Sequence, residues 1–181
     1  MKVNEGWRDC GWEIYPDETP PDIMLNFRKI YDERIETEFG TCYVGLVVRE
    51  NSSKESICQR LPKIMKNGKA YLLTIYMCNS LYFNANSRTR GEIADFSKPA
   101  CLVLYGSNDD GDFELLRTGP INHHTWKKYT LLIQPQKDFH TIILEADFED
   151  EIFTYNGHLF LDNISDLEEV NAAEYDKISI E

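Results

Sequence analysis

Short apolar runs, rich in β-branched and aromatic residues, recur along the chain and are separated by turn residues. Apolar and polar positions alternate within several of them, as in WKKYTLLIQP (126–135), and a period of two is typical of a half-buried strand. The predicted strands cover residues 41–50, 55–61, 70–80, 100–107, 113–119, 126–135, 140–148 and 157–165. This pattern predicts an all-β fold of two packed antiparallel sheets, with a jelly-roll β-sandwich as the leading architecture.

Turn signals support this pattern, whereas helical periodicity is weak. The Asn-Gly of KNGK (66–69) indicates a tight turn, and the Asp-Gly of NDDGDF (108–113) predicts a two-residue hairpin. The best helical candidate is residues 22–36, where apolar residues share one face, but an irregular entry segment fits this stretch equally well. Long loops are predicted at residues 11–22 and 79–99, and loops of about twenty residues are often functional.

The charge of the chain limits its partners. Its 181 residues suit one domain, and 31 acidic against 19 basic residues give a net charge of −12. This sign disfavours nucleic acid, whose affinity comes largely from Lys and Arg neutralising phosphates, and is compatible with neutral ligands such as sugars. Acidic residues are frequent in 166–181, where apolar periodicity is weak, so we expect a domain over 1–165 followed by a frayed acidic tail.

The cysteines and the terminus leave the compartment open. The five cysteines form no C-x-x-C pair, which argues against structural zinc, and both core thiols and a few disulfides are compatible with their spacing. No run of about 18 apolar residues occurs, so we expect no membrane insertion. Residues 1–12 lack a signal-peptide core. We expect either a secreted or cell-envelope protein whose leader has been removed, or a cytoplasmic one.

Aromatic residues are the most informative chemical feature, since the common catalytic motifs are absent from the sequence and we do not expect an enzyme. An exposed aromatic face can stack on a sugar ring while amide, Arg and acid groups hold its hydroxyls. The segment NSLYFNANSRTR (79–90) offers both kinds of group. The predicted ligand-binding residues are Tyr82, Phe83, Asn84, Asn86, Arg88, Arg90 and Trp12. The alternative is that these aromatic rings only cap the open ends of the core.

The order of segments also carries a resemblance. The stretch GTCYVGLVVRE…ESICQRLPKIMKNGKAYLLTIYMC, with the later WKKYTLLIQP and LFLDNIS, resembles galactose-binding-like jelly-roll domains, particularly carbohydrate-binding modules appended to xylanases and glucanases. With its segment GWRDCGWE, the chain is most similar to a variant found in Bacteroidetes cell-surface proteins. The resemblance covers about residues 40–165. It implies a monomeric, non-catalytic domain that binds a glycan or a cell-surface protein.

The same resemblance implies a structural calcium ion. Such domains often hold calcium between the first and last strands, with a ligand from a D-[DN]-[IV] motif in the last strand. Asp162 occupies that position in LFLDNIS, and Glu5 in NEGW corresponds to an early acidic ligand. Asp162 and Glu5 are therefore the expected ligands. The alternative function is a structural or protein-interaction domain of a larger cell-envelope protein, without sugar binding.

Overall fold

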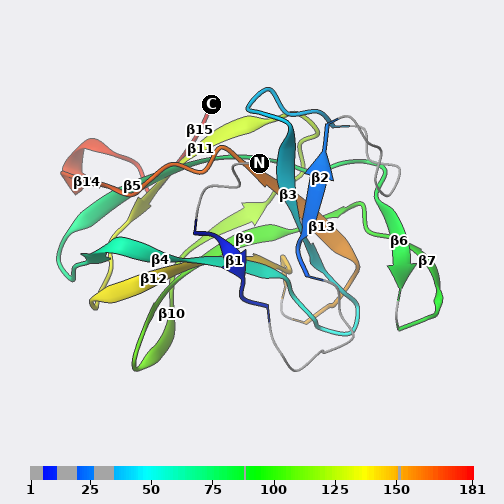
Figure 1. Ribbon diagram of the computed structural model, residues 1–181, viewed down its shortest axis with the longest axis horizontal. Helices are drawn as coiled ribbons and strands as arrows, with labels where there is room; N and C mark the ends of the chain where they lie inside the picture. Colours follow the sequence, from blue (N-terminus) through cyan, green and yellow to red (C-terminus); the bar gives the residue numbers. More distant parts are fainter. Residues whose placement is uncertain (1–5, 12–19, 27–34, 88, 151) are drawn as a thin grey trace.

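Two antiparallel sheets form the protein in a computed structural model that describes residues 6–11, 20–26, 35–87, 89–150 and 152–181 (Figure 1). Sheet A has the order β1 (Arg8–Asp9), β4 (Ser56–Met65), β12 (Phe139–Asp147), β9 (Cys101–Asn108) and β10 (Gly111–Pro120). Sheet B has the order β15 (Ile178–Ile180), β11 (Lys127–Ile133), β5 (Ala70–Cys78), β13 (Gly157–Asp162), β3 (Cys42–Val48) and β2 (Asp22–Leu25). The predicted two-sheet β-sandwich is confirmed.

The core lies between the two sheets and is built from alternate residues of each strand. In β5, Leu73, Ile75 and Met77 point inward, where they meet residues such as Leu104 of β9 and Leu144 of β12. All five side chains are almost completely buried. Alternation with a period of two therefore places one apolar face of each sheet in a shared core.

The predicted strands and the two-residue hairpin are present in the structure. All eight predicted strands occur as β3, β4, β5, β9, β10, β11, β12 and β13, with ends shifted by a few residues. Gly111 pairs with Asn108, which leaves Asp109 and Asp110 as the turn between β9 and β10. Gly111 has a φ of 122°, a conformation that favours glycine. The Asp-Gly dipeptide was therefore a reliable signal of this turn.

The helical hypothesis for residues 22–36 is wrong at its beginning. Residues 22–25 form the edge strand β2, which pairs with β3 so that Met24 lies opposite Tyr43. Both side chains are buried in a cluster on the outer face of sheet B. The strand forms because β3 supplies hydrogen-bond partners that periodicity alone does not reveal. Residues 27–34 lie outside the described part of the chain.

The predicted loop at 79–99 contains regular structure of its own. Residues Asn84–Ser87 (β6) and Glu92–Asp95 (β7) form an antiparallel hairpin, and Lys98–Pro99 (β8) pairs in parallel with β13. Phe83 and Phe96, on either side of the hairpin, are 1% and 3% exposed. The segment is ordered because these rings cover the outer face of sheet B.

The expected frayed tail at 166–181 is also corrected. Residues Glu168–Val170 (β14) pair with β5, and β15 pairs with β11, so both extend sheet B. Between them lies a single 3₁₀ turn, Ala172–Glu174. Val170 and Ala172 pack on the outer-face residues Ala70, Leu72 and Leu132. The apolar contact, which is not visible as periodicity in the tail, fixes this acidic segment on the sheet.

The described residues contain no helix that is long and apolar enough to cross a membrane.

Close packing between β9 and β12 yields a test of the core. A Cβ atom at Gly106 would lie 2.5 Å from ring carbons of Phe139, whereas one at Gly119 would meet nothing within 4 Å. We expect Gly106→Ala to lower the free energy of unfolding by about 1–3 kcal/mol through overpacking, and Gly119→Ala to change it by less than about 0.5 kcal/mol. Urea denaturation of both variants measures this difference. Equal stability of the two would contradict the packing described here.

Candidate functional site

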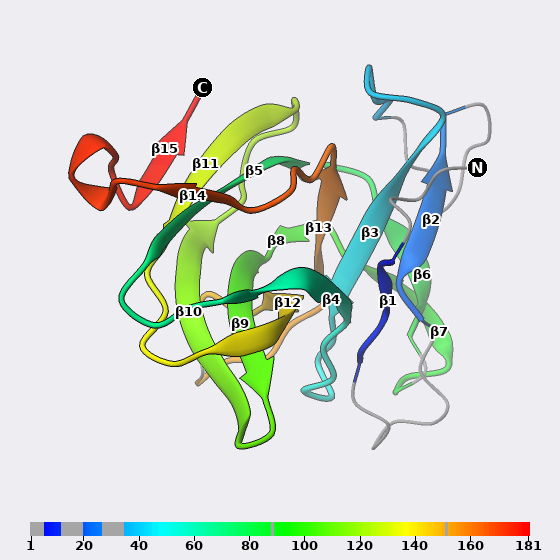
Figure 2. The same ribbon diagram turned by 60° about the vertical axis from the view of Figure 1, so that its left-hand side comes forward.

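A cleft of about 500 Å³ opens at one edge of the sandwich, between β1 of sheet A and β2 and β3 of sheet B. β1 pairs with β4, and Figure 2 shows it beside β3 and β2. The last two residues of β13 and the two that follow it, 161–164, line the inner side of the cleft, and residues 39–41 line its mouth. Segments distant in the sequence therefore build one concave site.

The floor of the cleft continues the apolar core. Ile57 of β4 and Leu161 of β13 are 6% and 1% exposed and belong to the central hydrophobic cluster. Val44, Ile164 and Trp7 are partly buried and pack against the same cluster. The floor thus consists of hydrocarbon side chains and the Trp7 ring. It lies at the edge where the two sheets no longer cover each other.

Aromatic and apolar side chains also reach the mouth of the cleft. Phe39 is 39% exposed, and its ring centroid lies 4.1 Å from that of Tyr76. Ile23 of β2 is 37% exposed. Because Tyr76 supports one side of Phe39, the remaining ring surface is held in place and is available for contact with a ligand.

Several polar side chains line the cleft beside these rings, among them Arg8, Asp9, Asp162 and Asn163. Asp9 accepts a hydrogen bond from the Gly11 N–H at 2.9 Å. Asp162, at the end of β13, is partly buried, and burial raises the pKa of its carboxyl group, although hydrogen bonds from the Thr37 hydroxyl and the Asn163 N–H oppose the rise. The cleft therefore combines an apolar interior with charged and amide groups.

Of the two expected calcium ligands, only Asp162 lies in the described part of the chain. Asp162 lies where the motif placed it, and Glu5 lies outside the described residues. Among the residues that the structure describes, no group of three or more His, Cys, Asp or Glu side chains is arranged to hold a metal ion. A calcium ion beside Asp162 would therefore need backbone or amide oxygen ligands as well, and calcium binding stays a prediction.

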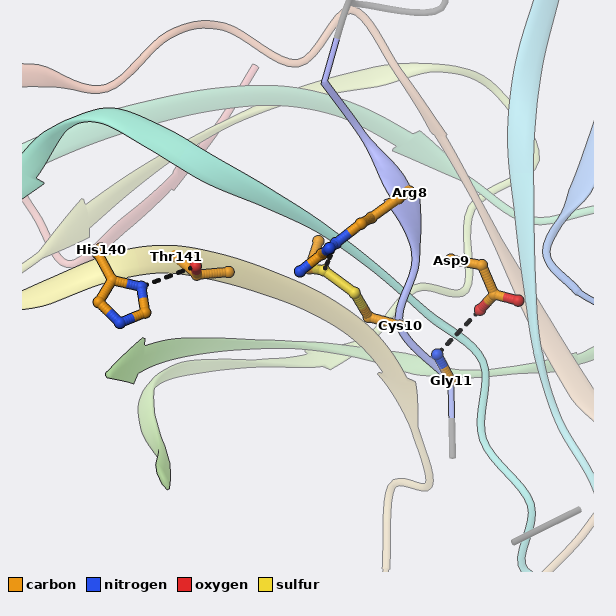
Figure 3. The surroundings of a disulfide bond; sticks show 7 residues. Arg8, Asp9, Cys10, Gly11, His140 and Thr141 are labelled. Atoms are coloured by element: carbon orange, nitrogen blue, oxygen red, sulfur yellow. Dashed lines mark hydrogen bonds between the residues drawn. A yellow bond between two sulfur atoms is a disulfide. The ribbon is translucent and has the colours of Figure 1, made fainter. Parts of the chain in front are cut away.

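A disulfide fastens the wall of the cleft that β1 provides. Cys10 and Cys58 are linked, with their Cα atoms 5.7 Å apart, and the Cys10 N–H donates to the Ser56 carbonyl oxygen. Figure 3 shows Arg8 reaching over this bond, where its Nε lies 3.4 Å from the Cys58 Sγ. The sequence left disulfides open, and this one holds a strand of only two residues against β4.

The other three cysteines, Cys42, Cys78 and Cys101, form no disulfide. Cys78 and Cys101 are 0% and 2% exposed. Cys42 is partly exposed and lines the cleft. Its thiol therefore reports on whether the cleft is accessible.

The ligand-binding residues predicted in 79–90 lie away from the cleft. Phe83 is 1% exposed and stacks on His158, with ring centroids 4.6 Å apart, so it is a core residue and cannot stack on a ligand. Tyr82 is 60% exposed. The remaining described residues, Asn84, Asn86 and Arg90, lie on or beside the β6–β7 hairpin, and the Arg90 guanidinium pairs with Glu50. Arg88 and Trp12 lie outside the described residues.

The predictions from the sequence include one residue that lines the cleft and omit the others. The D-[DN]-[IV] motif pointed to Asp162, but Phe39, Ile23 and Asn163 were not selected. No local signal brings residue 39 and residue 8 together.

His158 pins residues 80–96 to sheet B. Its Nε2 accepts a hydrogen bond from the Ser80 N–H at 2.9 Å, so the proton of the neutral ring is on Nδ1, which lies 2.6 Å from the Phe96 carbonyl oxygen. The ring is completely buried between Phe83 and Phe160. Burial lowers the pKa of His158 to about 4, because the charged form loses its hydration.

An ionic network occupies the outer face of sheet A. Burial opposes ionisation of Asp147, but hydrogen bonds from Lys54 and Arg117 outweigh it and lower the pKa of Asp147. Two residues earlier on β12, burial raises the pKa of Glu145 to about 7, and the Tyr105 hydroxyl lies 3.3 Å from its carboxylate. These side chains satisfy one another's charges and hydrogen bonds, so the network connects β9, β10, β12 and Lys54.

Neither a protein-family model nor a curated protein sequence matches the chain. Solved structures do: the CBM22-1–GH10 modules of Clostridium thermocellum endo-1,4-β-D-xylanase 10B, complexed with xylohexaose, align over 94% of this chain at 9% identity with a TM-score of 0.51. The fold is that of a carbohydrate-binding module.

Two further structures resemble this module-like fold. A CBM4 protein aligns over 92% of this chain and 96% of its own length, at 11% identity and a TM-score of 0.49. The enzymatically active domain of bacteriophage CBA120 tailspike protein 4 aligns over 92% of this chain at 10% identity and a TM-score of 0.48. The present chain spans 27% of the xylanase chain and 20% of the tailspike chain, so the likeness concerns the fold.

The buried imidazole predicts a pH dependence of stability. Between pH 6.5 and about 4 the unfolded chain binds a proton at His158 that the folded protein does not, so stability falls as the pH decreases through this window. The contribution amounts to about 3 kcal/mol. We expect the non-titrating variant His158→Gln to lose stability less steeply than the wild type when unfolding is measured at several pH values. Parallel slopes for the two proteins would contradict the buried neutral ring.

The disulfide predicts that reduction loosens the wall of the cleft. Replacing Cys10 and Cys58 by serine should lower the free energy of unfolding by about 2–4 kcal/mol and accelerate alkylation of Cys42 by N-ethylmaleimide. A dithiol reductant should have the same effect on the wild type and none on the double variant, which serves as its control. Unchanged alkylation after complete reduction would show that the cleft wall does not depend on the bond.

Proposed function

We propose that the protein is a non-catalytic glycan-binding domain whose ligand lies in the edge cleft. The observation that carries this proposal is the arrangement of the Trp7 and Phe39 rings beside Arg8, Asp9 and Asp162 in one concave site. An aromatic face stacks on the apolar face of a sugar ring, while carboxylate and guanidinium groups accept from and donate to its hydroxyls. The fold of carbohydrate-binding modules supports the same function without assigning a ligand.

The size of the cleft suits a short glycan segment. Small-molecule sites commonly enclose about 300–1,000 Å³, and this cleft of about 500 Å³ falls within that range. Its polar groups carry both signs of charge, which favours a neutral ligand over a strongly anionic one. The net charge of −12 acts in the same direction.

The disulfide supports the compartment expected from the resemblance. Such bonds persist in oxidising environments and are rare in the cytosol of mesophiles. We therefore place the protein in a secreted or cell-envelope setting, where polysaccharides are accessible. A monomeric state and a calcium ion near Asp162 belong to the same proposal.

A protein-interaction role is the second candidate and has its own supporting observation. Several large apolar side chains are more than half exposed outside the cleft: Leu81, Tyr82, Ile93, Ile152 and Phe153. They lie in the β5–β6 connection, the β6–β7 hairpin and the β12–β13 connection. Side chains of this kind contribute to protein interfaces when they form a contiguous patch.

Affinity electrophoresis through gels that contain single polysaccharides tests glycan binding. We expect retardation by at least one polysaccharide, and Phe39→Ala should weaken it about tenfold, equivalent to about 1.4 kcal/mol. Phe153→Ala removes a ring outside the cleft that is more exposed than Phe39, 69% against 39%, and should leave retardation unchanged. An assay of released reducing sugars should show no hydrolysis. Retardation that depends on Tyr82 but not on Phe39 would move the site to the 79–99 segment, and no retardation in any gel would reject glycan binding.

A further inference from the structure

We propose that the cleft selects glycans that carry a small neutral apolar substituent, such as an O-acyl or aryl group, and buries that substituent between the two sheets. The inference rests on the glycan-binding function proposed above and specifies the chemical class of its ligand. It follows from the separation of apolar and polar groups inside the cleft.

The deep part of the cleft offers few polar groups to a hydroxyl, since among the described residues it is lined by hydrocarbon side chains and the Trp7 ring. The side chains of Ile57, Leu161, Val44 and Ile164 are hydrocarbons, and the first two are almost fully buried. The strands that carry the first three use their backbone groups in the ladders between β1 and β4 and among β3, β5 and β13. A sugar hydroxyl placed here would lose its hydration without gaining a partner, which disfavours an unsubstituted sugar ring in this position.

No buried polar side chain calls for a ligand hydroxyl in this region. Among the residues that the structure describes, the one buried side-chain polar atom without a hydrogen-bond partner is the Asn79 Oδ1, and Asn79 does not line the cleft. The floor is therefore complementary to hydrocarbon.

The polar groups gather at the mouth. Arg8, Asp9, Thr41 and Asn163 line the cleft and are exposed, and Asp162 is partly exposed at the end of β13. Phe39 and Ile23 stand beside them, each with more than a third of its surface exposed. This arrangement suits an amphiphilic ligand whose sugar stays at the mouth, on the Phe39 ring, while a substituent enters the floor.

Charge restricts the substituent further. Two carboxylates and one guanidinium line the mouth, and the whole chain carries a net charge of −12. A sulfate or uronate substituent would meet this negative field and would also require a charge in the apolar floor. A neutral ester or aryl group avoids both costs.

Alkyl glycosides provide the test, with the Cys42 thiol as reporter. Methyl, butyl and hexyl β-glycosides of glucose and xylose are compared for their protection of Cys42 from N-ethylmaleimide. Cys42 is a suitable reporter because it lines the cleft, whereas the thiols of Cys78 and Cys101 are buried. We expect the affinity to rise by about fourfold for each added methylene group until the floor is filled. Acetylated xylan should likewise retard the protein more than the same xylan after mild alkaline deacetylation.

Two matched variants show whether the substituent occupies the floor. Val44→Thr introduces a hydroxyl of nearly equal volume into the floor and should weaken hexyl glycosides at least fivefold while leaving methyl glycosides unchanged. Val170→Thr makes the same change on β14, outside the cleft, and should leave both ligands unchanged.

The outcomes separate this inference from the function on which it rests. Retardation by polysaccharides together with equal protection by methyl and hexyl glycosides would overturn the substituent preference and leave glycan binding intact. Protection by 1-hexanol as strong as that by hexyl glycosides would show an apolar site without a sugar component, and would overturn the proposal. Absence of protection by every probe would overturn it as well.

Discussion

Strand β5 is apolar on its inner face and at both ends of its outer face, and much of the architecture follows from the need to cover these surfaces. Its inner residues Leu73, Ile75 and Met77 pack against sheet A. Its outer residues Ala70 and Leu72 are covered by the C-terminal segment, and Cys78 is covered by the cluster around Phe83 and Phe96. Full burial of one large apolar side chain contributes about 1.5–3 kcal/mol, enough to hold segments with little structural preference of their own.

The cleft lies where this covering is incomplete. At the edge of the sandwich, β1 has two residues and β2 has four, so neither strand closes the space between the sheets. Hydrocarbon side chains of the core therefore meet the solvent beside charged residues of the edge. The disulfide keeps β1 against β4. The backbone hydrogen bonds of a two-residue strand would hold this pairing only weakly.

Two titratable side chains in the packed layers, His158 and Asp147, both have partners. His158 is neutral and uses both ring nitrogens, and it joins the 80–96 segment to β13. Asp147 is ionised and is paired with Lys54 and Arg117. Both pKa values are lowered but the charge states differ, because burial keeps the imidazole neutral whereas Lys54 and Arg117 keep the Asp147 carboxylate ionised. Both groups connect segments that are distant in the sequence.

Local sequence patterns predicted eight of the strands and the class of fold. A period of two and the spacing of turn residues predicted β3, β4, β5 and β9–β13, because those patterns reflect local backbone geometry and the burial of one face. The motif at the end of β13 also drew attention to Asp162 before its neighbours were known.

The segments that cover the outer face of sheet B and the position of the cleft could be identified only from the tertiary structure. Phe83 looked like an exposed ring of a loop, yet it is buried because β13 presents His158 and Phe160 beneath it. Residues 8, 39, 44 and 162 belong to separate segments, and their meeting in one cleft depends on how the two sheets pack at their edge. Local preferences encode strands and turns, but such long-range contacts arise only when the faces of different strands are buried together.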